Sequence, residues 1–230
     1  MKKIAIIVAG GSGQRMNSAV AKQFLLLQNK PILYHTLLAF KAADENTALI
    51  VVLPEDQIAY WKSLCDKYPE ILRETPHQIV IGGETRFHSS KNGIAAIDSN
   101  QSCLVAIHDG VRPLIQPSTI TKAYDMAADK GNCVVSVSSK DSIRLWDSTA
   151  NSYKSVLRDD VKIIQTPQIF ELNSLKDAFS QTYSPLFTDD ASVMEAHGAT
   201  IHLVEGEYTN IKITTPEDLL VAESILAQPK

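Results

Sequence analysis

The sequence is poor in the features that mark disulfide-rich, zinc-binding or membrane-spanning proteins. Only three of its 230 residues are cysteines (Cys65, Cys103 and Cys133), and they form no CxxC pair. An odd, widely spaced set of this kind fits neither a disulfide framework nor a zinc site, so we expect reduced cysteines in the core. The apolar run at residues 4–9 is far shorter than the ~20 residues of a membrane span, and it ends in glycines rather than a cleavage site. These absences predict a cytoplasmic protein with no membrane contact.

An excess of positive charge is also missing. The 22 Lys and Arg residues against 26 Asp and Glu give a formal net charge of −4. A nucleic-acid-binding protein needs a basic surface to neutralise phosphates, so this balance argues against that class. With 44% hydrophobic and 21% charged residues, the chain has the composition of a globular protein with a full core. Its local basic residues suit a small anionic substrate instead.

Short apolar runs rich in β-branched residues alternate with helical patterns. The expected strands are residues 4–8, 48–53, 78–81, 103–107 and 133–137, and the expected helices are residues 31–43, 55–67, 87–97 and 117–130. Near-continuous apolar strands that alternate with helices are typical of a mostly parallel sheet covered on both faces. Right-handed crossover connections then predict a doubly wound, Rossmann-like α/β fold.

The alternation of strand and helix is interrupted in the second half of the chain. Residues 142–146 and 153–157 alternate around a turn-prone stretch, which predicts a protruding β-hairpin. Helices are expected again at residues 172–181, 190–197 and 216–226, with further strands at 200–204 and 210–213. Without a repeat or a linker, we expect one domain over residues 1–230 with a hairpin arm at about 139–159. A lone hairpin is marginal in water, so a second copy of the chain is its simplest partner, in a homodimer.

A glycine-rich turn follows the first expected strand, with the sequence AGGSGQRM at residues 9–16. Such glycines bring backbone N–H groups close to a phosphate. A dinucleotide fingerprint needs a glycine where Met16 stands, and the Lys-Ser/Thr ending of a Walker A loop is missing. Arg15 and Lys22 at the mouth of the turn suit a triphosphate better than a dinucleotide. The alternative is a tight turn with two solvated basic residues.

Polar clusters follow other expected strands, where ligands of open α/β sheets bind. They are GGETR at residues 82–86, HDGVRP at 108–113 and TNIK at 209–212. Asp109 is placed to hold Mg²⁺ together with phosphate oxygens, although it also suits a turn cap. Asp189 and Asp190 begin a helical pattern, where capping and the helix dipole explain them. No HExxH or GxSxG motif supports a metalloprotease or a serine hydrolase.

Seven short stretches, taken together and in order, carry a family resemblance. They are AGGSGQRM at 9–16, KQF at 22–24, GGETR at 82–86, HDGVRP at 108–113, QTPQIF at 165–170, TDDAS at 188–192 and NIKIT at 210–214. On these stretches the chain resembles the 2-C-methyl-D-erythritol 4-phosphate cytidylyltransferases of the non-mevalonate isoprenoid pathway over essentially its whole length. The resemblance implies transfer of CMP from CTP to a sugar-alcohol phosphate, with release of pyrophosphate and with Mg²⁺ as the metal.

The resemblance also implies roles for single residues. The glycine-rich turn, with Gly11 and Gly13, would hold the triphosphate. The backbone of Ala9 and Gly10, together with Gly83 and Ser89, would frame the cytosine and the ribose. Arg15 and Lys22 would stabilise charge on the triphosphate, and Asp109 matches the family's magnesium ligand. Arg158 and Lys212 match residues that position the attacking phosphate, and the acceptor pocket would be lined by Arg112, Ser142, Thr166 and Thr188. In the family's homodimer the arms embrace, so that Ser142 and Arg158 would reach the neighbouring subunit's site.

Two positions depart from the family's usual pattern. Gly110 and Val111 stand where the fourth motif commonly reads Ala-Ala or Ala-Val, and Ser142 stands where Thr is frequent. Both keep the chemistry that is needed, a backbone and a hydroxyl. Two alternative functions stay open at this point: a ribitol 5-phosphate cytidylyltransferase that makes CDP-ribitol, and a nicotinamide-dependent oxidoreductase on the same fold. The missing third glycine and the two cations of the turn count against the second.

Overall fold

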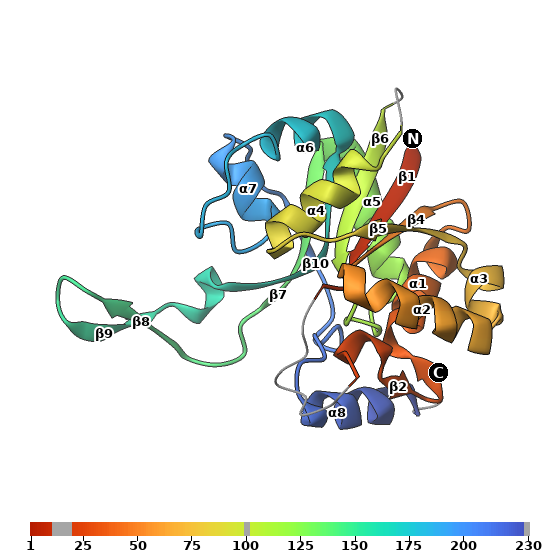
Figure 1. Ribbon diagram of the computed structural model, residues 1–230. Coiled ribbons are helices and arrows are strands. Elements are labelled where there is room, and N and C mark those ends of the chain that lie inside the picture. The colour runs from red at the N-terminus through yellow and green to blue at the C-terminus, as the bar shows by residue number, and fades with distance from the viewer. Residues whose placement is uncertain (11–19, 99–101, 228–230) are drawn as a thin grey trace.

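A seven-stranded sheet forms the centre of the protein in a computed structural model, which describes residues 1–10, 20–98 and 102–227 (Figure 1). Its strands, from one edge to the other, are β11 (Leu203–Glu205), β7 (Asn132–Ser138), β10 (Lys162–Glu171), β6 (Cys103–Asp109), β1 (Lys2–Val8), β4 (Ala48–Leu53) and β5 (His77–Ile81). All neighbours pair in parallel except β10, which is antiparallel to both β6 and β7. The predicted doubly wound, mostly parallel α/β fold is confirmed.

Helices cover both faces of this sheet, which explains why its central strands are apolar without interruption. One face carries α1 (Ile32–Ala43), α2 (Glu55–Lys67), α3 (Glu70–Glu74) and α5 (Pro117–Lys130), and the other carries α4 (Arg86–Ala95), α6 (Leu172–Ala178) and α7 (Asp190–Ala196). In β1, Ala5 and Ile7 pack into the first layer, whereas Ile4 and Ile6 pack into the second. Successive side chains of a strand point to opposite faces, so a strand between two helical layers must be apolar on both.

A third, smaller apolar cluster lies beyond the two layers. There α8 (Pro216–Leu226) packs with the short strands β2 (Leu26–Leu27) and β3 (Lys30–Pro31), next to the 3₁₀ turn η2 (Lys22–Phe24). Val111 and Ile213 are buried in this cluster. Val111 lies two residues after the end of β6, so the cluster supports the loop at the carboxyl end of that strand.

The expected hairpin is present and extends from the body of the protein. Strands β8 (Ile143–Asp147) and β9 (Ser152–Val156) pair in antiparallel with each other and with no strand of the central sheet among the described residues. A 3₁₀ turn, η3 (Arg158–Asp160), follows before β10. Trp146 and Tyr153 face each other across the hairpin with ring centroids 5.0 Å apart. Figure 1 shows this arm projecting to the left of the sheet.

Two sequence-based expectations about strands were wrong or incomplete. Residues 210–213 form no strand, because their backbone groups form hydrogen bonds with loops and not with a neighbouring strand. Ile213 N, for example, donates to Val111 O at 2.9 Å. Strand β10 was not predicted at all. Its polar side chains and Pro167 interrupt the apolar pattern, and its pairing with β7 shifts register between Ile164 and Gln168. The three cysteines are free and buried, as predicted. None of the described helices has the length and apolar character needed to cross a membrane.

Candidate active site

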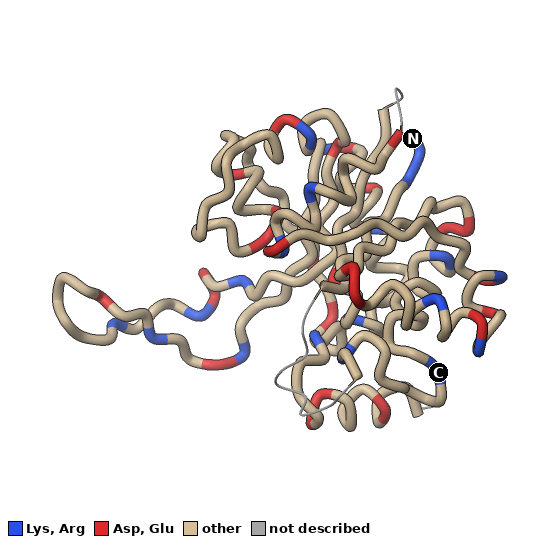
Figure 2. The backbone as a smooth tube through the Cα atoms, in the orientation of Figure 1, with Lys and Arg blue, Asp and Glu red and all other residues tan. Residues whose placement is uncertain are grey.

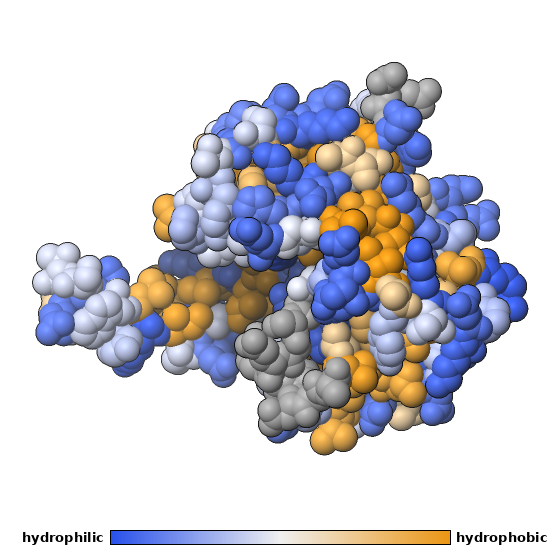
Figure 3. Space-filling view, in the orientation of Figure 1, coloured by the Kyte–Doolittle hydropathy of each residue, from blue (hydrophilic) through white to orange (hydrophobic). Residues whose placement is uncertain are grey.

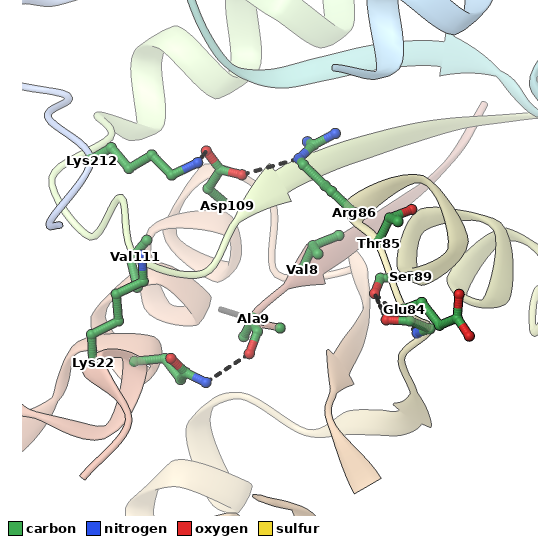
Figure 4. Close-up of a pocket in the computed structure, with 13 residues that line it drawn as sticks. Val8, Ala9, Lys22, Glu84, Thr85, Arg86, Ser89, Asp109, Val111 and Lys212 are labelled. Atoms are coloured by element: carbon green, nitrogen blue, oxygen red, sulfur yellow. Dashed lines mark hydrogen bonds and ion pairs between the residues drawn. The ribbon is translucent and has the colours of Figure 1, made fainter. Parts of the chain in front are cut away.

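A cavity of about 260 Å³ opens at the carboxyl ends of the parallel strands (Figure 4). It is lined by Val8, Ala9, Gly10, Lys22, Gln23, Gly83, Glu84, Thr85, Arg86, Ser89, Asp109, Val111 and Lys212. These residues come from the ends of β1 and β6 and the loops that follow them, from η2, from the β5–α4 turn with the start of α4, and from the segment before α8. The cavity therefore lies where ligands of an open α/β sheet are expected, at the crevice beyond the strand ends.

The turn between β5 and α4 forms one wall of the cavity and is held tightly against the helix. Gly83 N donates to Ser89 Oγ at 3.1 Å, and the Thr85 side chain caps α4 by accepting from His88 N. A Cβ on Gly83 would lie 2.4 Å from the His88 Cβ, closer than any real contact. Glycine is therefore required here by a close approach of backbone to helix. Opposite, buried Gln23 donates to Ala9 O at 2.8 Å and fixes the end of β1.

Asp109 is the centre of a charged cluster at the cavity wall. Its Oδ2 lies 3.0 Å from Lys212 Nζ and 3.2 Å from Arg112 Nε, and its Oδ1 lies 3.4 Å from Arg86 Nε. Burial of this carboxyl, which is only 6% exposed, would raise its pKa. The three cations outweigh burial and hold the pKa of Asp109 well below its usual range. Asp109 is thus a carboxylate at any physiological pH.

A neutral histidine holds the backbone behind Asp109. His108 is fully buried, and burial lowers its pKa to about 4. The Thr166 hydroxyl accepts from Asp109 N at 3.1 Å and lies 3.0 Å from His108 Nδ1, while His108 Nε2 lies 3.2 Å from Arg112 O. An uncharged ring satisfies all three contacts when Thr166 donates to Nδ1 and Nε2–H donates to the Arg112 carbonyl. Thr166 therefore directs its hydrogen to His108 and not into the cavity.

The structure brings most of the predicted residues to one place. The predicted residues that line the cavity are Ala9, Gly10, Lys22, Gly83, Ser89, Asp109 and Lys212. Arg112 and Thr166 contact Asp109 from behind. Thr188 lies in the loop before α7, and Ser142 and Arg158 lie exposed on the arm, so none of these three lines the cavity. Gly11, Gly13 and Arg15 lie outside the described residues.

Sequence reasoning gave no role to Arg86, which turns out to line the cavity beside Asp109. The signal was present, since Arg86 ends the GGETR stretch at a strand end, but its partners were not predictable from that stretch. Asp189 is the helix cap that was expected, with Ser192 as the other member of a capping box. Asp190 was expected to serve the same purpose, yet it is buried and pairs with Arg86 at 2.6 Å.

The fold and the cavity define a class of enzyme. A mostly parallel α/β sheet carries a space of ligand size beyond its strand ends. Two lysines, one arginine, the buried carboxylate of Asp109 and the exposed Glu84 line this space, as expected of an enzyme that binds a polyanionic nucleotide.

Comparison with known proteins specifies the family. The model of the family described as 2-C-methyl-D-erythritol 4-phosphate cytidylyltransferase matches residues 3–228, and the chain belongs to this family. Relatives of that name from Phocaeicola vulgatus and Bacteroides thetaiotaomicron are 45% and 44% identical over 226 residues, covering 98% of this chain and 100% of each relative. The crystal structure of 4-diphosphocytidyl-2C-methyl-D-erythritol synthase from Anaerococcus prevotii is similar with a TM-score of 0.82 and 29% identity, covering 99% of this chain and 97% of that one.

Proposed function

We infer that the protein transfers CMP from CTP to 2-C-methyl-D-erythritol 4-phosphate, giving 4-diphosphocytidyl-2-C-methyl-D-erythritol and pyrophosphate. The observation that carries this inference is the charged cluster around Asp109 at the wall of the cavity, in a chain of this family. A reaction between a phosphate monoester and a nucleoside triphosphate brings two polyanions together, and it needs cations placed on both sides of the reacting phosphorus.

In the proposed reaction an oxygen of the acceptor phosphate attacks the α-phosphorus of CTP. A new P–O bond forms as the bond from the α-phosphorus to its bridging oxygen breaks, and the pair of electrons leaves with pyrophosphate. The attacking phosphate is already an anion, so no general base is required. The neutral, buried His108, whose ring nitrogens face Thr166 and Arg112, supports a mechanism without one.

The nucleotide end of the cavity is assigned to the wall next to β1 and α4. We propose that the backbone of Ala9 and Gly10, with Gly83 and Ser89, frames the base and ribose of CTP. Lys22, which lines the cavity on the side opposite α4, and Arg15, with Gly11 and Gly13, would stabilise charge on the triphosphate. The close packing of Gly83 on His88 supports this assignment, because a rigid edge selects a flat ring by shape.

Asp109 is the residue we propose to hold Mg²⁺. Magnesium is commonly held by one or two carboxylates together with substrate phosphates, and a single buried carboxylate at the cavity wall fits that donor set. No group of three or more His, Cys, Asp or Glu side chains suited to a metal occurs in the described parts of the chain. The protein would therefore supply one ligand and CTP the others. When bound, the ion would neutralise charge on the phosphates.

The acceptor end is assigned to the Lys212 side of the cluster. Lys212 would hold the attacking phosphate. Arg112 and Thr166 would support this end of the site by holding Asp109 from behind, and Thr188, in the loop before α7, remains a predicted acceptor residue that does not line the cavity. The arm supports a homodimer in which Ser142 and Arg158 of one protomer complete the site of the other. Its exposed apolar side chains are Leu145, Trp146, Tyr153 and Leu157, each 51% to 74% exposed. Figure 3 shows apolar side chains along the stalk where the arm leaves the body, and Figure 2 shows charges of both signs on the arm.

Buried free thiols support a cytoplasmic location, since a reducing compartment keeps them unpaired. The experiment that tests the function measures pyrophosphate release from CTP and Mg²⁺ with methylerythritol phosphate and with ribitol 5-phosphate in parallel. Preference for the first supports the proposal, and preference for the second moves the protein to CDP-ribitol synthesis by the same chemistry. Release with neither acceptor, together with tight NADH binding, would instead favour the oxidoreductase alternative.

A further inference from the structure

Asp190 is a buried carboxylate that the proposed reaction leaves without a role. It lies in the first turn of α7 and is 1% exposed. Its Oδ1 accepts from Ser90 Oγ at 2.8 Å, and its Oδ2 lies 2.6 Å from Arg86 Nη2. Helix capping does not explain this arrangement, because Asp189 is the cap of α7. Both partners of Asp190 come from α4, one turn apart, and Arg86 also lines the cavity.

Arg86 is shared unequally between two carboxylates. Its Nη2 is 2.6 Å from Asp190, whereas its Nε is 3.4 Å from Asp109 Oδ1, at the outer limit of a hydrogen bond. Burial lowers the pKa of Arg86, and the two carboxylates outweigh burial and raise it above its ordinary value, so the guanidinium keeps its charge. The shorter contact shows that Asp190 is the main counter-ion of Arg86.

The two carboxylate oxygens of Asp109 differ in how closely cations approach them. Oδ2 has two cations at 3.0 and 3.2 Å, from Lys212 and Arg112, while Oδ1 has, among the residues that the structure describes, only the distant Arg86. Arg112 is held elsewhere as well, because its Nη1 donates to Asn210 O at 2.8 Å. Of the two oxygens of Asp109, Oδ1 is therefore the one less engaged by the cations of the described residues.

We propose that Asp190 is a positioning residue for the nucleotidyl transfer, which holds Arg86 away from Asp109 and leaves Oδ1 of that carboxylate for a divalent cation with CTP. The inference rests on the proposed function, because it takes Asp109 as the metal ligand. The inference gives the proposed reaction a further residue, Asp190, whose carboxylate touches neither substrate nor metal and acts through the charge of Arg86.

The net charge of the cluster predicts which substitutions weaken metal binding and which restore it. Arg86, Arg112, Lys212, Asp109 and Asp190 together carry one net positive charge. Asp190→Asn keeps the shape of the side chain but raises that charge to two, and Asp109 is then the one counter-ion left to Arg86 within the described part of the chain. The double substitution Arg86→Gln with Asp190→Asn returns the cluster to one positive charge. Metal binding should therefore be lost in the single variant and recovered in the double variant.

The test measures binding of Mn²⁺, a spectroscopic substitute for Mg²⁺, to the full-length protein with CTP and without acceptor. Electron paramagnetic resonance of free Mn²⁺, compared with a protein-free solution at the same CTP concentration because CTP itself binds Mn²⁺, yields the dissociation constant with no turnover. We expect Asp190→Asn to raise it about tenfold or more, since one unit charge a few ångströms away has an effect of at least that size at an effective dielectric near 20. The double variant should bind within about threefold of the wild type.

Two further variants keep the test decisive. Ser90→Ala removes the second partner of Asp190 without changing a charge, and should weaken Mn²⁺ binding about twofold. This variant tests the inference if Asp190→Asn does not fold. Asp44→Asn breaks an ion pair with Lys3 of 3.1 Å away from the cavity, and should leave Mn²⁺ binding unchanged. Melting temperatures of all variants separate lost stability from lost binding.

Three results would overturn the inference in distinguishable ways. Unchanged Mn²⁺ binding in both Asp190→Asn and Ser90→Ala, with lower melting temperatures, would show that Asp190 only joins α7 to α4. A double variant as weak as Asp190→Asn would show that Arg86 itself is needed at the site. Absence of Mn²⁺ binding by the wild type with CTP would remove the metal site of the proposed function, and this inference with it.

Discussion

Replacement of Lys212 by methionine should separate stability from catalysis. The Lys212 ammonium lies 3.0 Å from Asp109 Oδ2, and at an effective dielectric near 20 this distance corresponds to an attraction of about 5 kcal/mol. The net contribution to folding is much smaller, because the lysine side chain is 41% exposed and water solvates it in the unfolded chain. Asp109 also keeps Arg86 and Arg112. We expect a loss of less than about 1 kcal/mol in the free energy of unfolding.

The effect on the reaction should be larger. If Lys212 stabilises charge on the acceptor phosphate as the transition state forms, its removal resembles the loss of one oxyanion donor, which costs about 10²-fold or more in rate, or about 2.7 kcal/mol. Lys22→Ala should lose a similar factor at the triphosphate. Pyrophosphate release with both substrates saturating measures kcat, and urea unfolding measures stability on the same preparation.

Lys3→Met is the matched control for this experiment. It removes the same charge from an ion pair of 3.1 Å, with a side chain 24% exposed, away from the cavity. The control should retain full turnover at a comparable change in stability. Turnover of Lys212→Met within about threefold of the wild type would refute the assignment of this lysine to the reaction.

Three other results follow from particular contacts. Gly83→Ala places a Cβ 2.4 Å from the Cβ of His88, so the β5–α4 turn must shift. We expect a raised KM for CTP and a loss of about 1 to 3 kcal/mol in the free energy of unfolding, measured by thermal unfolding. Unchanged values would contradict the idea that this turn forms a rigid cavity wall. Trp146→Asp on the arm should convert a dimer to monomers in sedimentation and abolish turnover, whereas a wild type that already sediments as a monomer would refute the shared site. Burial raises the pKa of Asp218, but hydrogen bonds from Thr214 and Thr215 outweigh it and lower the pKa below its ordinary value of 3.8. Asp218→Ala should therefore lower the free energy of unfolding by about 1 kcal/mol at neutral pH. In urea titrations of both proteins, this difference should shrink as the pH falls below about 4 through the folded-state pKa of Asp218. A difference that does not depend on pH would show that the charge of Asp218 is not involved.

Local sequence patterns were enough to predict much of this protein. The helices 55–67, 117–130 and 216–226 were predicted to the residue, because amphipathic periodicity and proline or glycine at their ends are local signals. The glycine of the β5–α4 turn and Asp109 at the end of β6 were identified for a similar reason. A residue that directly follows a parallel strand lies at the same edge of the sheet wherever that strand is placed.

Contacts between distant segments were decided only by the tertiary structure. Strand β10 enters the sheet antiparallel between β6 and β7, which brings Thr166 against the backbone of Asp109. The approach of α7 to α4 buries Asp190 against Arg86, and capping had been a sufficient local explanation for that aspartate. Periodicity and spacing describe the neighbours of a residue along the chain. The partner of a buried charge is selected by how helices and strands pack, and this depends on the whole fold at once.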